Sequence, residues 1–158
     1  MSKKPELSLS VQYPDPRMKE LVSRGQIRRW VQAALFAPAE ITVRFVNAEE
    51  GRILNRDYRS KDYATNVLTF AYTEGDGEGN TEGESTTTQA DIILCTDVLQ
   101  EEAAAQGKTL LAHTAHLLVH GIMHAQGYSH DEPDEADEME ALEIDVLASI
   151  GIANPYSA

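Results

Sequence analysis

The sequence predicts one α+β domain over residues 1–158, in which a four-stranded mixed β-sheet is packed with helices. Short segments with β-branched residues or period-two alternation indicate strands, and longer segments with apolar residues three and four positions apart indicate helices. These segments follow the order β-α-β-α-β-β-α-α-α, without an internal repeat. A length of 158 residues and a hydrophobic content of 42% suit a single core.

The first half of the chain alternates strands and helices. Residues 7–13 alternate apolar and polar side chains and predict a strand. A helix is expected to begin by Gln26 and to end before Pro38. Its inward stripe consists of Ile27, Trp30, Val31, Ala34 and Leu35. Residues 41–46 are rich in β-branched side chains and predict a second strand, and residues 48–58 predict a second helix.

The second half predicts two strands followed by three helices. The strands are expected at residues 67–72 and 90–95. Between them, residues 73–89 contain many Gly, Glu and Thr residues and no aliphatic one, so we expect a mobile acidic loop. A short helix is expected to be capped by Asp97 and to end at Gly107. A long helix is expected over residues 109–126, and a last helix is expected to begin at Pro133. The last helix has an inward stripe of Met139, Leu142, Val146, Leu147 and Ile150.

The formal net charge of −13 is distributed unevenly. Residues 1–61 hold 12 of the 13 Lys and Arg residues and 7 of the 26 acidic residues. Contacts from Lys and Arg to phosphate dominate the affinity of proteins for nucleic acid. The basic first third therefore allows a polyanionic partner, although solvated charged faces explain the charge pattern equally well.

Composition also indicates the compartment. No apolar run approaches the roughly 20 residues that a membrane span needs, and the N-terminus lacks the apolar region of a secretory signal. The one cysteine, Cys95, lies in an apolar run and is expected to be a buried hydrophobic residue. We therefore expect a cytoplasmic protein without membrane association.

The most informative stretch is the motif His120-x-x-x-His124-x-x-Gly127-x-x-His130. A helix turns once per about 3.6 residues, so His120 and His124 lie one above the other. Gly127 can adopt the left-handed conformation that ends helices, which lets His130 return to the same point. Three protein ligands and one open position are typical of catalytic zinc. The motif predicts one Zn²⁺ per chain, although three histidines would also suit nickel, iron or cobalt.

The same spacing is similar to the metzincin metalloprotease motif. Those proteases carry Glu directly after the first histidine as the general base, and here that position is Gly121. Peptide hydrolysis by that mechanism lacks its base, so a zinc metallopeptidase is the second candidate function.

Three segments of the sequence match the pattern of one family. They are His116-Leu-Leu-Val-His120-Gly-Ile-Met-His124-Ala-Gln-Gly-Tyr-Ser-His130-Asp131, Leu54-Asn-Arg-Asp-Tyr-Arg59-Ser-Lys61-Asp62-Tyr-Ala-Thr-Asn66-Val-Leu-Thr-Phe70 and Ala90-Asp91-Ile-Ile-Leu-Cys95. Together these segments resemble the bacterial YbeY family of rRNA-maturation endoribonucleases. The chain departs from the family pattern at Ala64, where proline is common, at Ala90, where glycine is usual, and in the longer acidic loop. None of these departures touches the expected ligands.

The resemblance implies a zinc-dependent hydrolase that cleaves single-stranded RNA during ribosome maturation and quality control. The implied partners are rRNA, the small ribosomal subunit and its assembly factors. The family's metal ligands correspond to His120, His124 and His130, and its functional arginine corresponds to Arg59. A guanidinium can hold two phosphate oxygens at once, and zinc supplies Lewis acidity.

The roles expected for other residues near these positions are less specific. We expect Lys61 to add a phosphate contact and His116 to lie behind the metal ligands or in the substrate cleft, a structural role being its alternative. A structural role is favoured for His113. Asp131 either serves the last ligand or caps the next helix. For Arg59 the alternative is a surface ion pair with Glu50, Asp57 or Asp62.

The sequence leaves open the route of RNA cleavage and a third candidate function. RNA cleavage can proceed by attack of a metal-activated water on phosphorus or by attack of the ribose 2′-OH, which gives a cyclic phosphate. A third candidate function is a non-catalytic ribosome-assembly factor in which the metal is structural.

Overall fold

The computed structural model describes residues 6–72, 87–128 and 132–156. Within these ranges the chain forms four strands and six helices. In chain order they are β1 (Leu7–Gln12), α1 (Arg17–Leu21), α2 (Arg24–Ala34), β2 (Ala39–Val46), α3 (Ala48–Arg59), β3 (Val67–Ala71), β4 (Thr88–Cys95), α4 (Thr96–Gln106), α5 (Leu110–Ala125) and α6 (Pro133–Ser149).

The sheet has the strand order β1-β2-β4-β3. Strands β1, β2 and β4 are parallel neighbours, and β3 pairs antiparallel with β4. Parallel neighbours need a crossover connection, and α1 and α2 supply it between β1 and β2. The predicted α+β class with a four-stranded mixed sheet is confirmed. Strands β1 and β3 form the two edges of the sheet.

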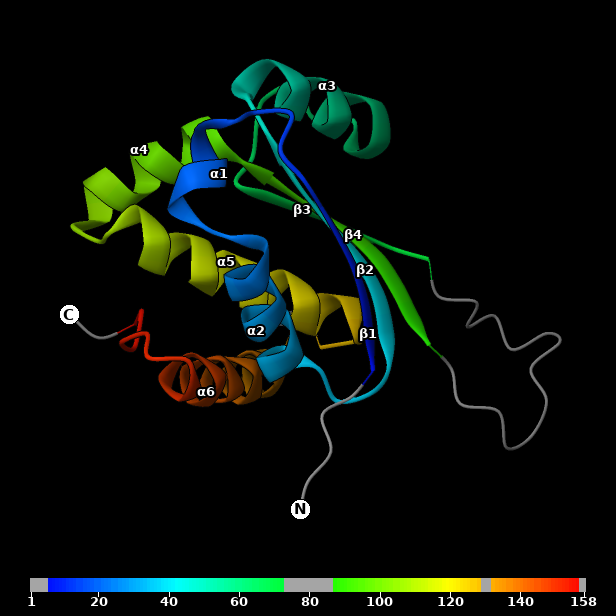
Figure 1. Cartoon of the computed structure of the whole chain (residues 1–158), viewed down its shortest axis with the longest axis vertical. Coiled ribbons are helices and arrows are strands. Elements are labelled where there is room, and N and C mark those ends of the chain that lie inside the picture. Colours follow the sequence, from blue (N-terminus) through cyan, green and yellow to red (C-terminus); the bar gives the residue numbers. More distant parts are fainter. Residues whose placement is uncertain (1–5, 73–86, 129–131, 157–158) are drawn as a thin grey trace, which may run out of the picture.

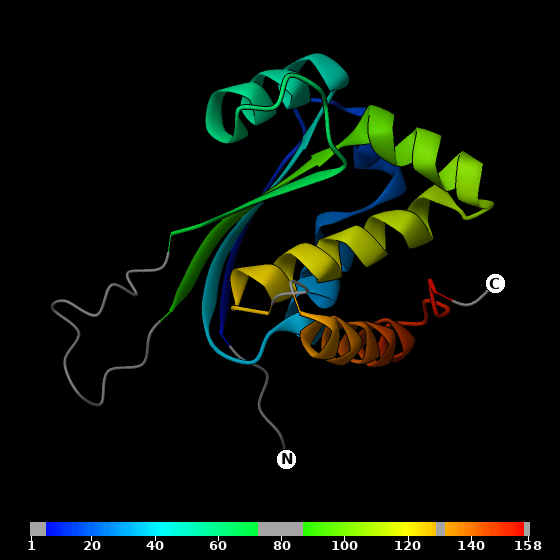
Figure 2. The ribbon, with the colours of Figure 1, turned by 180° about the vertical axis from the view of Figure 1, so that it is seen from behind.

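The two faces of the sheet are covered differently (Figure 1; Figure 2). Helices α2 and α5 pack on one face, α6 packs against these two helices, and together they bury the main core, which includes Trp30, Phe45, Ile92, Leu118 and Ile122. Helix α3 covers only part of the other face, over a smaller cluster of Val46, Leu68, Ile93 and Cys95. The alternation of apolar and polar side chains along β1 and β2 follows from this one-sided burial.

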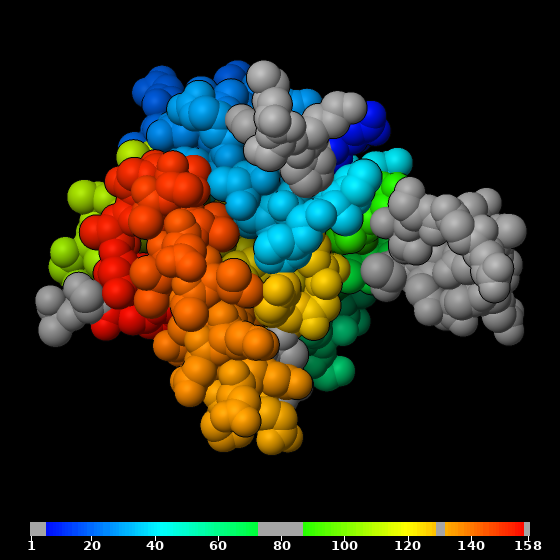
Figure 3. Space-filling view, turned by 90° about the horizontal axis from the view of Figure 1, so that it is seen from below, coloured from blue at the N-terminus to red at the C-terminus, as the bar shows by residue number. Residues whose placement is uncertain are grey.

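Helix α6 lies on the surface beside α2, and Figure 3 shows the two helices side by side from below. Its inward side carries the predicted apolar stripe, with Met139 and Leu147 fully buried. None of the described helices has the length and apolar character needed to cross a membrane.

Three details differ from the sequence prediction. Helix α1 was not expected, because it is only five residues long and buries a single residue, Met18, which gives no periodicity. Thr88 and Gln89 belong to β4 rather than to the expected acidic loop, because they pair with Ala39 and Glu40 of β2. The rest of that loop, residues 73–86, lies outside the described residues.

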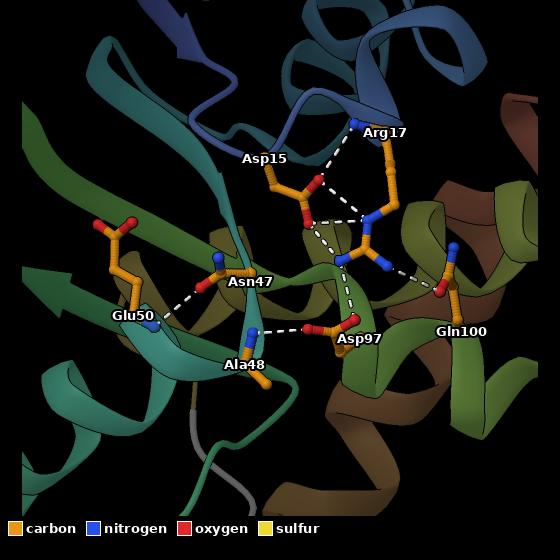
Figure 4. Close-up of polar contacts among 7 residues, drawn as sticks. All are labelled: Asp15, Arg17, Asn47, Ala48, Glu50, Asp97 and Gln100. Atoms are coloured by element: carbon orange, nitrogen blue, oxygen red, sulfur yellow. Dashed lines mark hydrogen bonds and ion pairs between the residues drawn. The ribbon is translucent and has the colours of Figure 1, made fainter.

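The third difference concerns Asp97, which does not cap α4: the cap position is Cys95. The Asp97 carboxylate instead accepts a hydrogen bond from the backbone N–H of Ala48 at 2.6 Å and pairs with Arg17 at 2.8 Å (Figure 4). Arg17 also pairs with Asp15 at 2.5 Å. This network joins α1, the start of α3 and the first turn of α4, so a tertiary contact takes the place of the expected cap.

Candidate metal and phosphate site

Helix α5 presents the histidines of the motif. The Thr109 hydroxyl accepts a hydrogen bond from the N–H of Ala112 and so begins the helix, as a capping residue does. His120 and His124, one turn apart, both line a cleft beside strand β3. The predicted helical placement of these two side chains on one face is therefore confirmed.

The rings of His120 and His124 converge at their Nε2 atoms, which are 3.0 Å apart. The Nδ1 atom of His124 donates to the backbone carbonyl of Tyr128 at 2.9 Å, since a carbonyl can only accept. The Nδ1 atom of His120 contacts the carboxylate of Glu143. With both Nδ1 atoms acting as donors, a neutral ring carries its lone pair on Nε2, which is the atom that binds a metal.

Glu143 is a completely buried carboxylate on α6. It contacts His120, the hydroxyl of Tyr156, and Nε2 of His116 at 3.2 Å. Burial raises the pKa of this carboxyl, but hydrogen bonds from His116, His120 and Tyr156 outweigh burial and lower the pKa to about 2. The carboxylate is thus ionised at neutral pH and fixes the orientation of the His120 ring.

The chain turns back directly after α5. Gly127 has φ of +105°, in the left-handed region that the sequence predicted for it. This turn returns the carbonyl of Tyr128 to His124, and the N–H of Tyr128 to the carbonyl of Met123 at 3.1 Å. His130 and Asp131 lie outside the described residues. Among the described residues, no group of three His, Cys, Asp or Glu side chains is placed to hold a metal ion.

The cleft has a volume of about 430 Å³ and is bounded by α5, β3 and the end of α3. It unites Arg59, from α3, with His120 and His124. The other lining residues are Asn66, Val67, Leu68, Thr69 and Ala71. Arg59, which is far from the two histidines in the sequence, therefore shares one cleft with them.

Arg59 does not form the surface ion pair that was its alternative. The three neighbouring acids are engaged by other arginines: Glu50 by Arg44, Asp57 by Arg56 and Asp62 by Arg52. The guanidinium of Arg59 instead donates to the carbonyl of Thr69 at 2.7 Å and lies 5.5 Å from the ring centre of Phe70. Its positive charge faces the cleft without a carboxylate partner among the described residues.

Gly121, the position that distinguishes the motif from that of the proteases, lies where α5 approaches the sheet most closely. A Cβ atom there would come within 3.2 Å of Ile92 and of the Thr69 hydroxyl. Because the helix packs directly on β3 and β4, a larger side chain at this position would be crowded against Ile92 and Thr69.

The remaining expected residues lie around the cleft. His113 is buried, 3% exposed, and contacts Glu102 at 2.8 Å, and Glu102 in turn accepts from the amide of Asn66 at 3.1 Å. This agrees with the structural role favoured for His113. His116 faces Glu143 and Tyr156, and Lys61 is solvent-exposed. Neither His116 nor Lys61 is among the described residues that line the cleft.

Glu143 and Tyr156 were missed by the sequence analysis. Glu143 had a signal, because it lies four residues after Met139 and four before Leu147 in the buried stripe of α6. A carboxylate in such a stripe must have buried partners. Tyr156 follows the last helix and had no comparable signal.

The α+β fold thus brings two converging imidazoles and an arginine together in one cleft. The family model described as "Endoribonuclease YbeY" matches residues 12–151 of the chain. The chain belongs to this family of RNA-cleaving hydrolases, and that membership supports an endoribonuclease role in rRNA processing.

Several relatives named Endoribonuclease YbeY match nearly the whole chain. The protein of Janthinobacterium sp. (strain Marseille) is 62% identical over 156 residues, covering 99% of this chain and 98% of the relative. That of Herminiimonas arsenicoxydans is 62% identical over 151 residues, covering 96% of each. That of Paraburkholderia phymatum is 54% identical over 160 positions, covering 99% of each. The resemblance found in the sequence motifs is thereby confirmed.

A solved structure supports the fold. The solution structure of a Thermotoga maritima protein superposes with a TM-score of 0.53 at 19% sequence identity. The match covers 95% of this chain and 99% of the other. At this level of identity the likeness concerns the fold alone.

Proposed function

We propose that this protein is a zinc-dependent endoribonuclease that cuts single-stranded rRNA in the cytoplasm during ribosome maturation and quality control. In this proposal His120, His124 and His130 hold one Zn²⁺, and Arg59 binds the phosphate that is cleaved. The observation that carries it is the convergence of two Nε2 atoms, 3.0 Å apart, in the cleft that Arg59 also lines.

The donor set fits a zinc ion. A Zn–N bond is about 2.0–2.1 Å long, so two nitrogens 3.0 Å apart can both reach one ion. The carboxylate of Glu143 and the carbonyl of Tyr128 hold the Nδ1 protons, which is the usual support for metal-binding imidazoles. His130 is included as the third ligand because of the sequence motif and the family resemblance. When bound, zinc supplies Lewis acidity and lowers the pKa of coordinated water.

Arg59 is the residue of the chain that provides positive charge for phosphate cleavage. Negative charge concentrates on the non-bridging oxygens of the phosphodiester in the transition state, and preorganised donors there lower the barrier. The hydrogen bond to Thr69 holds the guanidinium in place, while its other N–H groups can receive two phosphate oxygens. Arg59 therefore orients the phosphate toward the histidines.

The neighbouring residues contribute in less direct ways. Lys61, two residues beyond Arg59 and exposed, adds a phosphate contact further along the strand. His116 contacts Glu143, which favours a supporting role through that carboxylate over direct contact with the substrate. Partners beyond the RNA itself are the small ribosomal subunit and its assembly factors.

The experiment that tests the proposal compares three proteins purified free of host nucleases: wild type, His124→Ala and Arg59→Ala. Metal content, thermal unfolding and cleavage of a labelled single-stranded RNA are measured for each. We expect cleavage to fall about 10²- to 10³-fold without Arg59, with metal content and unfolding unchanged. His124→Ala is expected to remain folded but to lose both metal and cleavage.

Other outcomes would contradict the proposal. A fully active Arg59→Ala protein would remove its assigned role. Loss of fold in His124→Ala would favour a structural metal and the assembly-factor alternative. Equal cleavage by all three proteins would indicate a contaminating nuclease. The ends of the products also distinguish the two chemical routes, because only attack by the 2′-OH leaves a cyclic phosphate.

A further inference from the structure

A second groove, of about 420 Å³, lies across strand β3 from the histidine cleft. We call it the aromatic groove, after Tyr58, Phe70 and Tyr72 in its wall. Tyr58 is 67% exposed and Tyr72 is 50% exposed. The ring of Phe70 meets that of Tyr58 edge to face, with centres 5.4 Å apart. The rings of Tyr58 and Tyr72 are thus open to solvent, and the ring of Phe70 packs against that of Tyr58.

The aromatic groove and the histidine cleft meet at the free edge of β3. Consecutive residues of a strand point to opposite faces, so Thr69 lines the cleft and Phe70 lines the groove. Arg59 spans this edge, because its guanidinium donates to the carbonyl of Thr69 and lies against the ring of Phe70. A strand of RNA whose phosphate is held at Arg59 can therefore continue from one side of β3 to the other.

The groove is lined by one basic and two acidic side chains, and the basic one is paired. Arg44 binds Glu50 at 2.7 Å, and Asp91 accepts from the Tyr72 hydroxyl at 2.9 Å. The groove therefore offers little attraction to phosphate and presents flat apolar surface instead. Unpaired nucleobases bind to such surfaces by stacking on exposed aromatic rings, whatever their sequence.

We propose that the aromatic groove holds an unpaired nucleobase of the RNA substrate, near the phosphate bound by Arg59, by stacking on Tyr58 or Tyr72. This inference rests on the proposed function and adds a second contact to it. The stacked base fixes the path of the strand across the edge of β3, and it requires a base that is not paired in a duplex. The groove thereby contributes to selection of single-stranded RNA.

The first test measures the dissociation constant of the metal-loaded protein for a short single-stranded RNA. We expect Tyr58→Ala or Tyr72→Ala to weaken binding about tenfold, as loss of one stacked base does. Tyr58→Phe keeps the ring and is expected to bind like the wild type. The matched control is Tyr63→Ala, which truncates another tyrosine, 54% exposed, that lines neither the cleft nor the groove.

The second test removes one base at a time from the RNA and leaves its backbone intact. In the wild type we expect affinity to fall about tenfold at one position at a fixed distance from the cut. In whichever alanine variant binds more weakly, removal of that base should cause no further loss, because the stacking partner is already absent. Independent, multiplicative losses would overturn the proposal.

The two proposals fail in different ways. RNA that the wild type does not cleave would remove the proposed function and this inference with it. Normal cleavage with unchanged affinity in both alanine variants would overturn only the stacking contact. That second result would also be expected if the groove held an apolar side chain of a protein partner.

Discussion

Glu143 connects the candidate metal site on α5 with α6 and Tyr156. It reaches His120 from α6, a helix that follows the histidine helix in the chain, and it is held by Tyr156, which lies beyond the end of α6. A buried carboxylate is stable only when its charge is fully hydrogen-bonded. The contacts with His116, His120 and Tyr156 meet that need and place the negative charge directly behind the site.

Replacing Glu143 by Gln is expected to weaken zinc binding by about 10- to 100-fold, because His120 loses the charged partner of its Nδ1 proton. The measurement is competition for Zn²⁺ with a chromophoric chelator at neutral pH. Glu140→Gln is the matched control, since Glu140 lies one turn away on the exposed side of the same helix. Equal affinities in the two variants would show that the carboxylate does not support the metal.

Residues that act through local spacing were predictable from the sequence. His120 and His124 are four apart on one helix, and Gly127 ends that helix, so their placement needed no knowledge of the fold. Glu143 and Tyr156 act through contacts between elements that are far apart in the chain. The stripe of α6 marks Glu143 as buried, but no spacing rule specifies which side chains it meets, so only the packed structure could reveal the contacts of Glu143 and Tyr156.

At the scale of elements, the packing of α5 on the sheet sets the position of the histidines. Gly121 allows the helix to lie directly on Ile92 and Thr69. The same close approach brings His120 and His124 to the cleft beside β3.

Gly121→Ala is therefore expected to destabilise the protein by about 1–3 kcal/mol, as overpacking of a core does. Denaturant unfolding of the metal-free protein measures the change. Gly25→Ala is the control, because its Cβ would meet nothing nearer than the Ser23 hydroxyl at 3.9 Å, and alanine is a better helix former. A Gly121→Ala protein as stable as the wild type would mean that α5 has room to move away from the sheet.

Arg17 pairs with both Asp15 and Asp97, and this network joins α1, the start of α3 and the first turn of α4 (Figure 4). Hydrogen bonds from Arg17 are the main cause that lowers the pKa of the Asp15 carboxyl below its ordinary value of 3.8. The folded-state pKa is thus below the unfolded one. Asp15 therefore contributes stability above about pH 4, and that contribution is lost as pH falls through the folded-state value.

Asp15→Asn is expected to reduce the free energy of unfolding at neutral pH by about 1 kcal/mol, since the Arg17 side chain is 43% exposed and solvent weakens the pair. The difference from wild type should shrink as pH falls below 3.8, the ordinary pKa of the carboxyl. Urea unfolding of the metal-free proteins between pH 7 and 2 measures both effects. Asp57→Asn, at a pair exposed on both sides, is the control. A constant difference at every pH would contradict the assignment to this carboxylate.

Over the whole molecule, negative charge is concentrated on α6. Helix α3 contains three arginines and three acids, so its charges balance, whereas α6 contains seven acids and no basic residue. The two helices lie at opposite ends of the view in Figure 1. Since a polyanion is repelled by the acidic end, we expect RNA to approach from the side of α3.

Metal binding is expected to stabilise the whole chain as one unit. Zn²⁺ at about 100 times its dissociation constant should add about 2.7 kcal/mol, in a single cooperative transition if residues 1–158 form one domain. At pH 5 this stabilisation should disappear, because imidazoles must be neutral to bind metal and ordinarily titrate near pH 6.5. Thermal unfolding with metal and with chelator, at pH 7.5 and pH 5, measures this. Unchanged occupancy at pH 5, or two separate transitions, would contradict the prediction.

The order and type of the larger elements could be predicted because one-sided burial leaves periodic patterns in the sequence. The differences arose where a tertiary contact overrides a local signal. Asp97 resembles a helix cap but binds Arg17 and the backbone of Ala48. Thr88 and Gln89 have the composition of a loop but extend β4, because β2 continues beside them.

Both edges of the sheet have arginine side chains bound to their outer carbonyl groups. On β1, Arg28 donates to the carbonyl of Leu7 and Arg24 to that of Val11, as Arg59 does to Thr69 on β3. Unpaired strand edges are templates for aggregation, and charged side chains there prevent another strand from adding. Part of the positive charge of the first third of the chain thus protects the protein against self-association, and this requirement acts on Arg59 independently of RNA.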